Sequence, residues 1–90
     1  MDLREKVEHA ISSVIQIEQT FLQDDDGLIG YIVSPSFRGQ DSYTRQETIY
    51  DALRAPAANL TAEDLRRVVA VVAFTPEEYA VRGPEMLGAH

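Results

Sequence analysis

Apolar residues near the N-terminus recur at every third or fourth position, which is the period of an amphipathic helix. The positions that share this face are Leu3, Val7, Ala10, Ile11 and Val14. Asp2 precedes them and can cap the helix, and Glu5 lies in the first turn, where the helix dipole favours an anion. The pattern therefore predicts a helix at the N-terminus with one apolar face.

The period changes to two at residue 15, which predicts a strand. Ile15, Ile17 and Phe21 alternate with polar residues and are expected on one face. The turn sequence Asp-Asp-Asp-Gly follows at residues 24–27, with glycine where a positive φ is needed. Residues 28–33 form a second apolar run. Two strands around a short turn predict a β-hairpin.

The middle of the chain predicts two helices. Asp41 or Ser42 caps a helix that runs to about Arg54, and Pro56 stops it. The expected buried stripe of this helix is Ile49, Tyr50 and Leu53. The sequence Thr-Ala-Glu-Asp at residues 61–64 fits a capping box for a short third helix.

Residues 68–74 are continuously apolar and rich in valine, which predicts a strand buried on both faces. Thr75 and Pro76 begin a last helix, and Gly83-Pro84 end it, which leaves residues 83–90 as a tail. The order is αββααβα, an α+β class in one domain, residues 1–90. A hairpin followed by a helical crossover predicts a three-stranded mixed sheet, with the third strand parallel to the second and the helices packed on one face. A type II KH-like fold has the same outline.

Composition narrows the class of protein. The chain has 90 residues, of which 44% are apolar and 26% charged, so it is not a disordered tail. Its longest apolar run, residues 68–74, is too short to predict a membrane span. The charged N-terminus lacks the features of a signal peptide, which predicts a cytoplasmic protein. The absence of cysteine excludes disulfides, thiolate nucleophiles and Cys-ligated metals within the chain. The net charge of −7 argues against nucleic-acid binding.

Several short motifs suggest chemistry that their context does not favour. In an EF-hand frame around Gly27, positions 1 and 12 would be Leu22 and Val33, which carry no side-chain ligand oxygen. The sequence Gly-Leu-Ile-Gly at residues 27–30 spells the GxxG of KH domains, which would make the chain a nucleic-acid-binding regulator, but it lies in an acidic hairpin. His9 and His90 have no partner at metal-ligand spacing and no nucleophile beside them. We expect neither a metal site nor an enzyme.

The triplet Asp41-Ser42-Tyr43 opens a helix and resembles the modified serine of acyl carrier proteins, where Asp-Ser-Leu carries phosphopantetheine. The resemblance is local, because those proteins are all-helical bundles and this chain has two strand-like runs. A helix cap is the simpler interpretation of Ser42. Modification at Ser42 stays a remote alternative.

A longer stretch resembles the BolA family. Its frame is V-S-x-x-F-x-G-x5-R-x3-I-Y-x2-L, filled here by Val33, Ser34, Phe37, Gly39, Arg45, Ile49, Tyr50 and Leu53. The last apolar run, followed by Thr75, Pro76 and Tyr79, is similar to that family's last strand and helix start. The resemblance covers about residues 2–82. From the residues alone, Phe37 is expected to plug the core, Gly39 to take a conformation that other residues resist, and Arg45 to reach a carboxylate, a loop carbonyl or a ligand.

The resemblance implies a BolA-like, type II KH-like fold and a non-enzymatic partner of monothiol glutaredoxins, active in iron–sulfur, iron or stress regulation. Some members of the family are described as DNA-binding regulators. A histidine before the third strand and a Cys or His in the hairpin loop would help ligate a shared 2Fe–2S cluster. Here Arg67 occupies the histidine position and the hairpin offers only Asp24, Asp25 and Asp26. Neither arginine nor a hard carboxylate suits such a cluster, so we expect no cofactor.

The sequence therefore predicts an interaction domain, a monomer or weak dimer, that binds a protein partner such as a monothiol glutaredoxin without the usual ligands. The candidate surface joins Arg38, Gly39 and Arg45 to Arg66 and Arg67 at the start of the third strand. Arg67 could offer paired donors to a carboxylate of the partner or to glutathione, or could simply extend into solvent at the strand end. A KH-like nucleic-acid-binding regulator that uses the second and third helices is the alternative.

Overall fold

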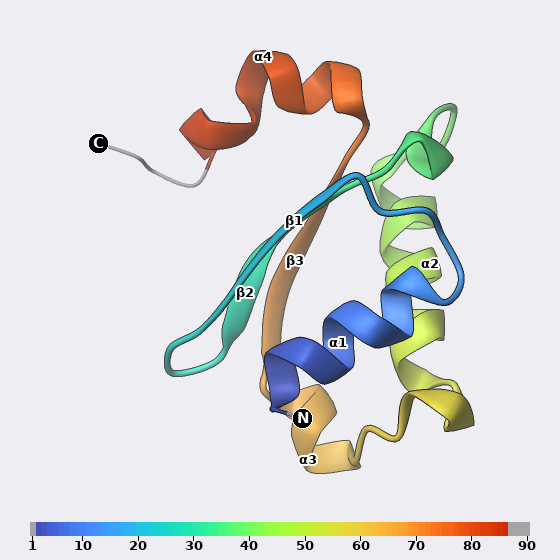
Figure 1. Cartoon of the computed structure of the whole chain (residues 1–90), viewed down its shortest axis with the longest axis vertical. Coiled ribbons are helices and arrows are strands. Elements are labelled where there is room, and N and C mark those ends of the chain that lie inside the picture. Colours follow the sequence, from blue (N-terminus) through green and yellow to red (C-terminus); the bar gives the residue numbers. More distant parts are fainter. Residues whose placement is uncertain (1, 87–90) are drawn as a thin grey trace.

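The computed structural model describes the backbone of residues 2–86 and the side chains of residues 2–81 (Figure 1). The helices are α1 (Leu3–Ser12), α2 (Ser42–Arg54), α3 (Ala62–Arg66) and α4 (Pro76–Met86). The strands are β1 (Gln19–Asp24), β2 (Leu28–Val33) and β3 (Val68–Phe74). Two single-turn 3-10 helices cover Pro35–Phe37 and Pro56–Ala58.

The three strands form one mixed sheet in the order β1-β2-β3. Strand β2 pairs with β1 antiparallel across the hairpin and with β3 parallel. A parallel neighbour requires a crossover connection, which α2 and α3 provide. The predicted order αββααβα and the predicted parallel third strand are both confirmed.

The core lies between the sheet and the pair of helices α1 and α2, which cover the same face in Figure 1. The first helix begins with the predicted cap, since the Asp2 carboxylate accepts from the Glu5 amide at 2.9 Å. The largest side chains of the core that are fully buried are Val7, Ile11, Leu28, Ile32, Phe37, Ile49, Leu53 and Val71.

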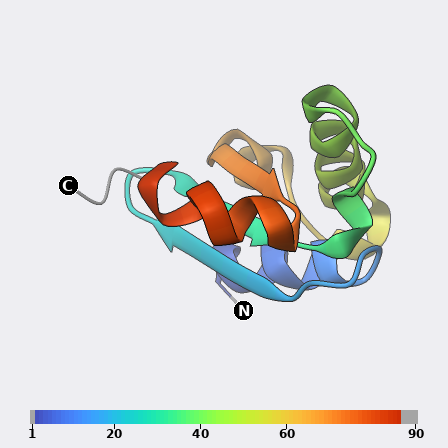
Figure 2. The ribbon, with the colours of Figure 1, turned by 90° about the horizontal axis from the view of Figure 1, so that it is seen from above.

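Helix α4 departs from the expectation that the helices all pack on one face. Its Tyr79 ring packs on Tyr31 and Phe74, with centroid separations of 5.1 and 6.3 Å. Tyr31 alternates along β2 with the core residues Leu28, Gly30 and Ile32, so it belongs to the opposite face. The view from above in Figure 2 shows α4 lying across one end of the sheet while α2 stands to one side. The helices α1 and α2 therefore cover one face, and α4 covers one end of the other.

Two expectations for the first half of the chain need correction. Helix α1 ends at Ser12, so Val14 does not continue its apolar face and is exposed. Leu22, not Phe21, faces the core, because Leu22 lies opposite Gly30 while Phe21 lies opposite Tyr31 on the outer face. Ile15 and Ile17 precede β1 and pack against the core, so they do not share one strand face with Phe21 as the alternation predicted.

The second half has three differences from expectation. Strand β3 has its predicted bounds, but it is not buried on both faces: Val69 and Ala70 are exposed, because no helix covers that part of the outer face. The cap of α2 is Asp41, whose carboxylate accepts from the Thr44 amide at 2.8 Å, so Ser42 is the first helical residue and not the cap. Helix α4 continues through Gly83-Pro84 to Met86, past the predicted end.

Candidate functional site

Arg45 joins three parts of the chain at the C-terminal end of β3. Its two terminal nitrogens donate to the two Glu78 carboxylate oxygens at 2.7 and 3.1 Å. Its Nε donates to the Gln40 carbonyl at 2.8 Å, and Nη1 also donates to the Ala73 carbonyl at 3.2 Å. Only 14% of the Arg45 side chain is exposed. Arg45 reaches both a carboxylate and a loop carbonyl, so it fixes α2, the loop before it and α4 to the end of β3.

Glu78 is held in place from a second side by the start of α4. Its Oε1 accepts from the Thr75 amide at 2.9 Å, and its own amide donates to the Thr75 hydroxyl at 3.2 Å. This reciprocal pair is a capping box. The hydrogen bonds from Arg45 and from the Thr75 amide lower the pKa of Glu78 to about 2. The carboxylate is therefore charged throughout the physiological range.

The loop that precedes α2 carries the other predicted residues of this end. Phe37 is fully buried, as expected of a core plug, and Gly39 has the positive φ of +78° that favours glycine. Arg38 donates from Nε to Glu77 at 3.1 Å and from Nη2 at 2.5 Å. This pair is exposed, with 56% of the Arg38 side chain in contact with solvent.

Arg67 lies at the opposite end of β3, against the hairpin turn. Its Nη2 is 2.8 Å from both carboxylate oxygens of Asp24, and its carbonyl accepts from the Leu28 amide at 2.7 Å. Half of the Arg67 side chain is exposed. Arg66 is exposed beside it at the end of α3. We call the contact between Asp24 and Arg67 the hairpin ion pair.

The structure does not bring the five predicted surface residues together. Arg38, Gly39 and Arg45 lie where β3 ends, while Arg66 and Arg67 lie where it begins. A strand of seven residues spans about 20 Å. The candidate surface therefore divides into two separate ends, and at one of them Arg45 is engaged inside the fold.

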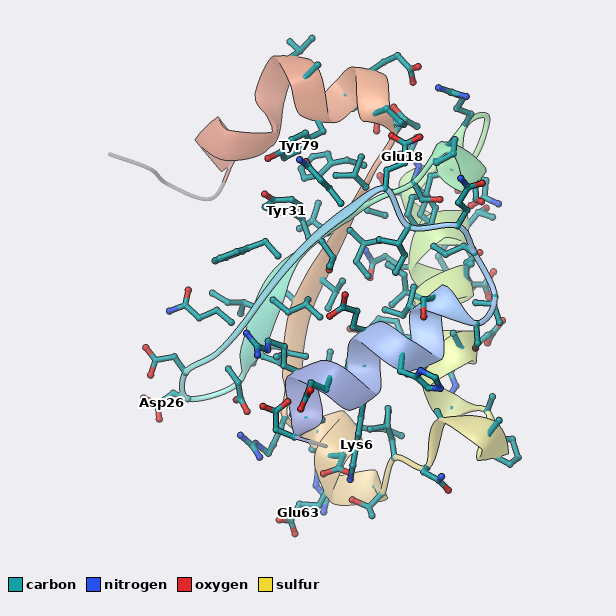
Figure 3. The ribbon with its side chains drawn as sticks, viewed as in Figure 1. Lys6, Glu18, Asp26, Tyr31, Glu63 and Tyr79 are labelled. Carbon is teal, nitrogen blue, oxygen red and sulfur yellow. The ribbon has the colours of Figure 1, made fainter. Side chains whose placement is uncertain are left out.

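A cluster of aromatic side chains on the outer face was not predicted as a site. The Tyr31 and Tyr79 hydroxyl oxygens are 2.9 Å apart and share a hydrogen bond (Figure 3). This bond and partial burial raise the pKa of Tyr31. Phe21 stacks on Tyr31 at 5.7 Å, and Phe74 meets it edge-on at 6.0 Å. Strand register gives the one signal that could have predicted the cluster, since Phe21 and Tyr31 are partners across the hairpin.

The remaining motifs acquire no chemistry from their surroundings. The segment 27–30 lies in the hairpin turn and β2, not between two helices as a KH loop would. Ser42 is exposed in a fold that contains a sheet, unlike the all-helical carrier proteins. His9 is exposed on α1, and His90 lies outside the described residues. Among the described side chains, those of residues 2–81, no group of three His, Cys, Asp or Glu could hold a metal ion.

No helix within the described range is both long enough and apolar enough to cross a membrane.

Comparison of the fold with known proteins identifies its type. No protein-family model matches the sequence, and no curated protein matches it. Among solved structures, a bol-like protein from Babesia bovis superposes with a TM-score of 0.66 at 22% identity, covering 91% of this chain and 94% of that one. BolA1 from Arabidopsis thaliana also gives 0.66, at 19% identity and 87% and 96% coverage. The BolA domain of SufE1 from the same plant gives 0.66, at 20% identity and 87% and 98% coverage. The chain therefore has a BolA-like fold, as the sequence resemblance predicted.

Proposed function

We propose that this chain is a non-enzymatic BolA-like interaction domain of the cytoplasm that binds a monothiol glutaredoxin in iron–sulfur, iron or stress regulation. The BolA-like fold supports a domain of this type, and one structure that it resembles is the BolA domain of SufE1. The observation that carries the proposal is the hairpin ion pair. It lies where the resemblance places the residues that contact a shared cluster.

The residues at this position do not fit a 2Fe–2S cluster. Both Asp24 oxygens already accept from the Arg67 guanidinium. Arginine has no lone pair to offer a metal, and a carboxylate is a harder ligand than the thiolate or imidazole that holds such clusters. This chain therefore contacts its partner with charged and polar groups and supplies no ligand to iron.

The proposed contact surface is the hairpin end of the molecule, centred on Arg66 and Arg67. Half of the Arg67 side chain is exposed although one of its terminal nitrogens is bound to Asp24, so its other donors face solvent. A guanidinium presents its N–H groups in a fixed fork that matches a carboxylate of a protein or of glutathione. Arg38 and Arg45 are left out of this surface because they lie at the other end of β3, where they pair with Glu77 and Glu78 of α4.

The experiment that tests the proposal is an amide NMR titration with the monothiol glutaredoxin of the same organism, in apo and cluster-loaded forms. We expect shifts at residues 24–28 and 66–68 with both forms, because binding does not require iron. Shifts with neither form at high partner concentration would overturn the proposed partner. Shifts confined to the cluster-loaded form would overturn the proposal that binding is independent of iron.

A matched pair of variants locates the surface. Arg67→Ala should weaken binding about tenfold, because a charge-assisted hydrogen bond contributes about 1.5 kcal/mol. Arg54→Ala is the control, since Arg54 is similarly exposed and forms an ion pair with Asp51 on α2. Equal affinities for the two variants would contradict the role of Arg67.

A further inference from the structure

The outer face of the sheet carries a group of apolar side chains that α4 leaves uncovered. Phe21 is 44% exposed, Ile29 41% and Val69 60%. We call these residues, together with Tyr31, the open face. Phe21 and Tyr31 are cross-strand partners, and Ile29 precedes Tyr31 by two residues on the same side of β2. Val69 is the extra residue of the bulge where β3 pairs with Leu28 and Ile29. The four residues therefore occupy neighbouring positions across the three strands.

Such a face is unusual for a sheet that packs on one side only. Antiparallel and mixed sheets with one solvated face normally place polar residues on it. Here β2 turns Ile29 and Tyr31 outward, and a contiguous apolar group of this kind marks an interaction surface more often than single exposed residues do. Helix α4 packs on this face at Tyr31 and Phe74, so a helix covers one part of the face and leaves the rest exposed.

Carboxylates stand at both ends of the open face, and none of its members is charged. Figure 3 shows Glu18 near α4 at one end and Asp26 in the hairpin turn at the other. Asp25 and Asp26 are exposed, and Asp24 beside them is engaged by Arg67. At the first end, Glu18 lines a shallow groove of about 420 Å³ with Tyr79 and Ala80 of α4. Arg38 lies within electrostatic range of Glu18, but its guanidinium is bound to Glu77.

We propose that the open face binds a basic amphipathic helix of a protein partner, which lies beside α4 and completes the second helical layer. A sheet face is buried most simply under helices. A helix of about 13 residues is about 20 Å long, which matches the length of β1. Its apolar stripe covers Phe21, Ile29 and Val69, and basic residues near its two ends pair with Glu18 and with Asp25 and Asp26.

Charge decides against a second copy of the chain as the occupant. Each copy carries a net charge of −7. A two-fold pairing of open faces would bring the same acidic ends into one interface, and like charges across an interface oppose association. A basic partner is instead attracted by the acidic residues at both ends of the open face. The proposal does not rest on the glutaredoxin partner, because Arg66 and Arg67 are not members of the open face.

The test uses two synthetic helical peptides with the same leucine stripe, one with arginines near both ends and one with glutamates in their place. Amide NMR of the full chain should show the arginine peptide shifting residues 19–23, 28–31 and 69–72. The glutamate peptide should shift none of them. Shifts confined to α1 and α2, equal binding of both peptides, or no binding by either would overturn the proposal. Sedimentation of the free chain that shows a dimer through the open face would also overturn it, in favour of a second copy.

Variants separate the apolar contact from the charges. Val69→Thr and Ile29→Thr keep β-branched residues at exposed strand positions, so both should fold, and each should weaken the arginine peptide about fivefold. Tyr43→Ser is the control, because Tyr43 is a highly exposed aromatic residue on α2, which packs on the opposite face. Glu18→Gln with Asp26→Asn should lower the affinity and its dependence on salt. Unchanged affinity in the two threonine variants and in the double charge variant would contradict the open face as the binding site.

Discussion

The guanidinium of Arg67 lies 2.8 Å from both carboxylate oxygens of Asp24, which ties the hairpin turn to the residue that precedes β3. The two residues are 43 positions apart in the sequence, and the pairing of Leu28 with Val68 brings them together. An ion pair thus occupies the position where the BolA resemblance implies two metal ligands. A carboxylate bound in this way is not free to coordinate iron.

Arg67→His should restore a ligand that suits an iron–sulfur cluster. An imidazole can bind iron, and the substitution also releases Asp24 from its ion pair. When the variant is mixed with cluster-loaded monothiol glutaredoxin, we expect a change in the visible circular dichroism of the cluster. The native chain should leave that spectrum unchanged. Identical spectra for the two proteins, with binding shown by NMR, would mean that the histidine position alone does not govern ligation.

Arg45→Ala and Arg38→Ala should differ in stability although both remove one ion pair with α4. Arg45 is 14% exposed and makes four hydrogen bonds, so its loss should lower the free energy of unfolding by about 3 kcal/mol. Arg38 is 56% exposed, and its loss should cost less than about 1 kcal/mol. Urea unfolding measures both values, and similar losses would mean that Arg45 is not a structural anchor.

The ion pair of Glu78 should make stability sensitive to acid. Its folded-state pKa of about 2 lies below the ordinary value of 4.5, so the charged form is favoured by folding. Its contribution is fully present above about pH 4.5 and is lost as the pH falls towards 2. Urea unfolding at a series of pH values should show that the free energy of unfolding falls less with decreasing pH in Glu78→Gln than in the native chain. Glu77→Gln, which affects a more exposed pair, should change that slope less.

Gly30→Ala should be much more damaging than Gly39→Ala. A Cβ at Gly30 would overlap the backbone carbonyl of Phe21 in the neighbouring strand, so the pairing of β1 with β2 would have to shift. We expect a loss of at least about 3 kcal/mol, measured by thermal or urea unfolding. A Cβ at Gly39 meets no atom within 4 Å, so only its positive φ opposes the substitution, at about 1 kcal/mol. A larger loss for Gly39→Ala would show that the positive φ of Gly39 costs more than the close approach of the strands at Gly30.

Local patterns were sufficient for most of the secondary structure. The bounds of β3, the hairpin around residues 24–27, the capping box at Thr61 and the helix start at Thr75 were predicted from residues a few positions apart. The errors occurred where burial depends on distant segments. Phe21 and Val69 look like core residues by their chemistry, but no helix lies over them.

The candidate site was predicted in part, for the same reason. Arg45 was expected to reach a carboxylate or a loop carbonyl, and it reaches both. The sequence could not show that Glu78 is the carboxylate, or that Asp24 pairs with Arg67, because each pair is more than 30 positions apart. It also could not show that the predicted surface residues lie at two ends of β3.

The sequence by itself determined the order of elements, because periodicity, capping and turn residues act over short distances. It also determined the parallel third strand, because a helical crossover after a hairpin has a preferred hand, and the spaced motif of residues 33–53 gave the resemblance to the BolA family. Only the tertiary structure decided which face of the sheet stays open and which charges are paired. Those outcomes depend on the placement of α4 and on the register between β2 and β3. Both are set by packing between segments that the sequence keeps far apart.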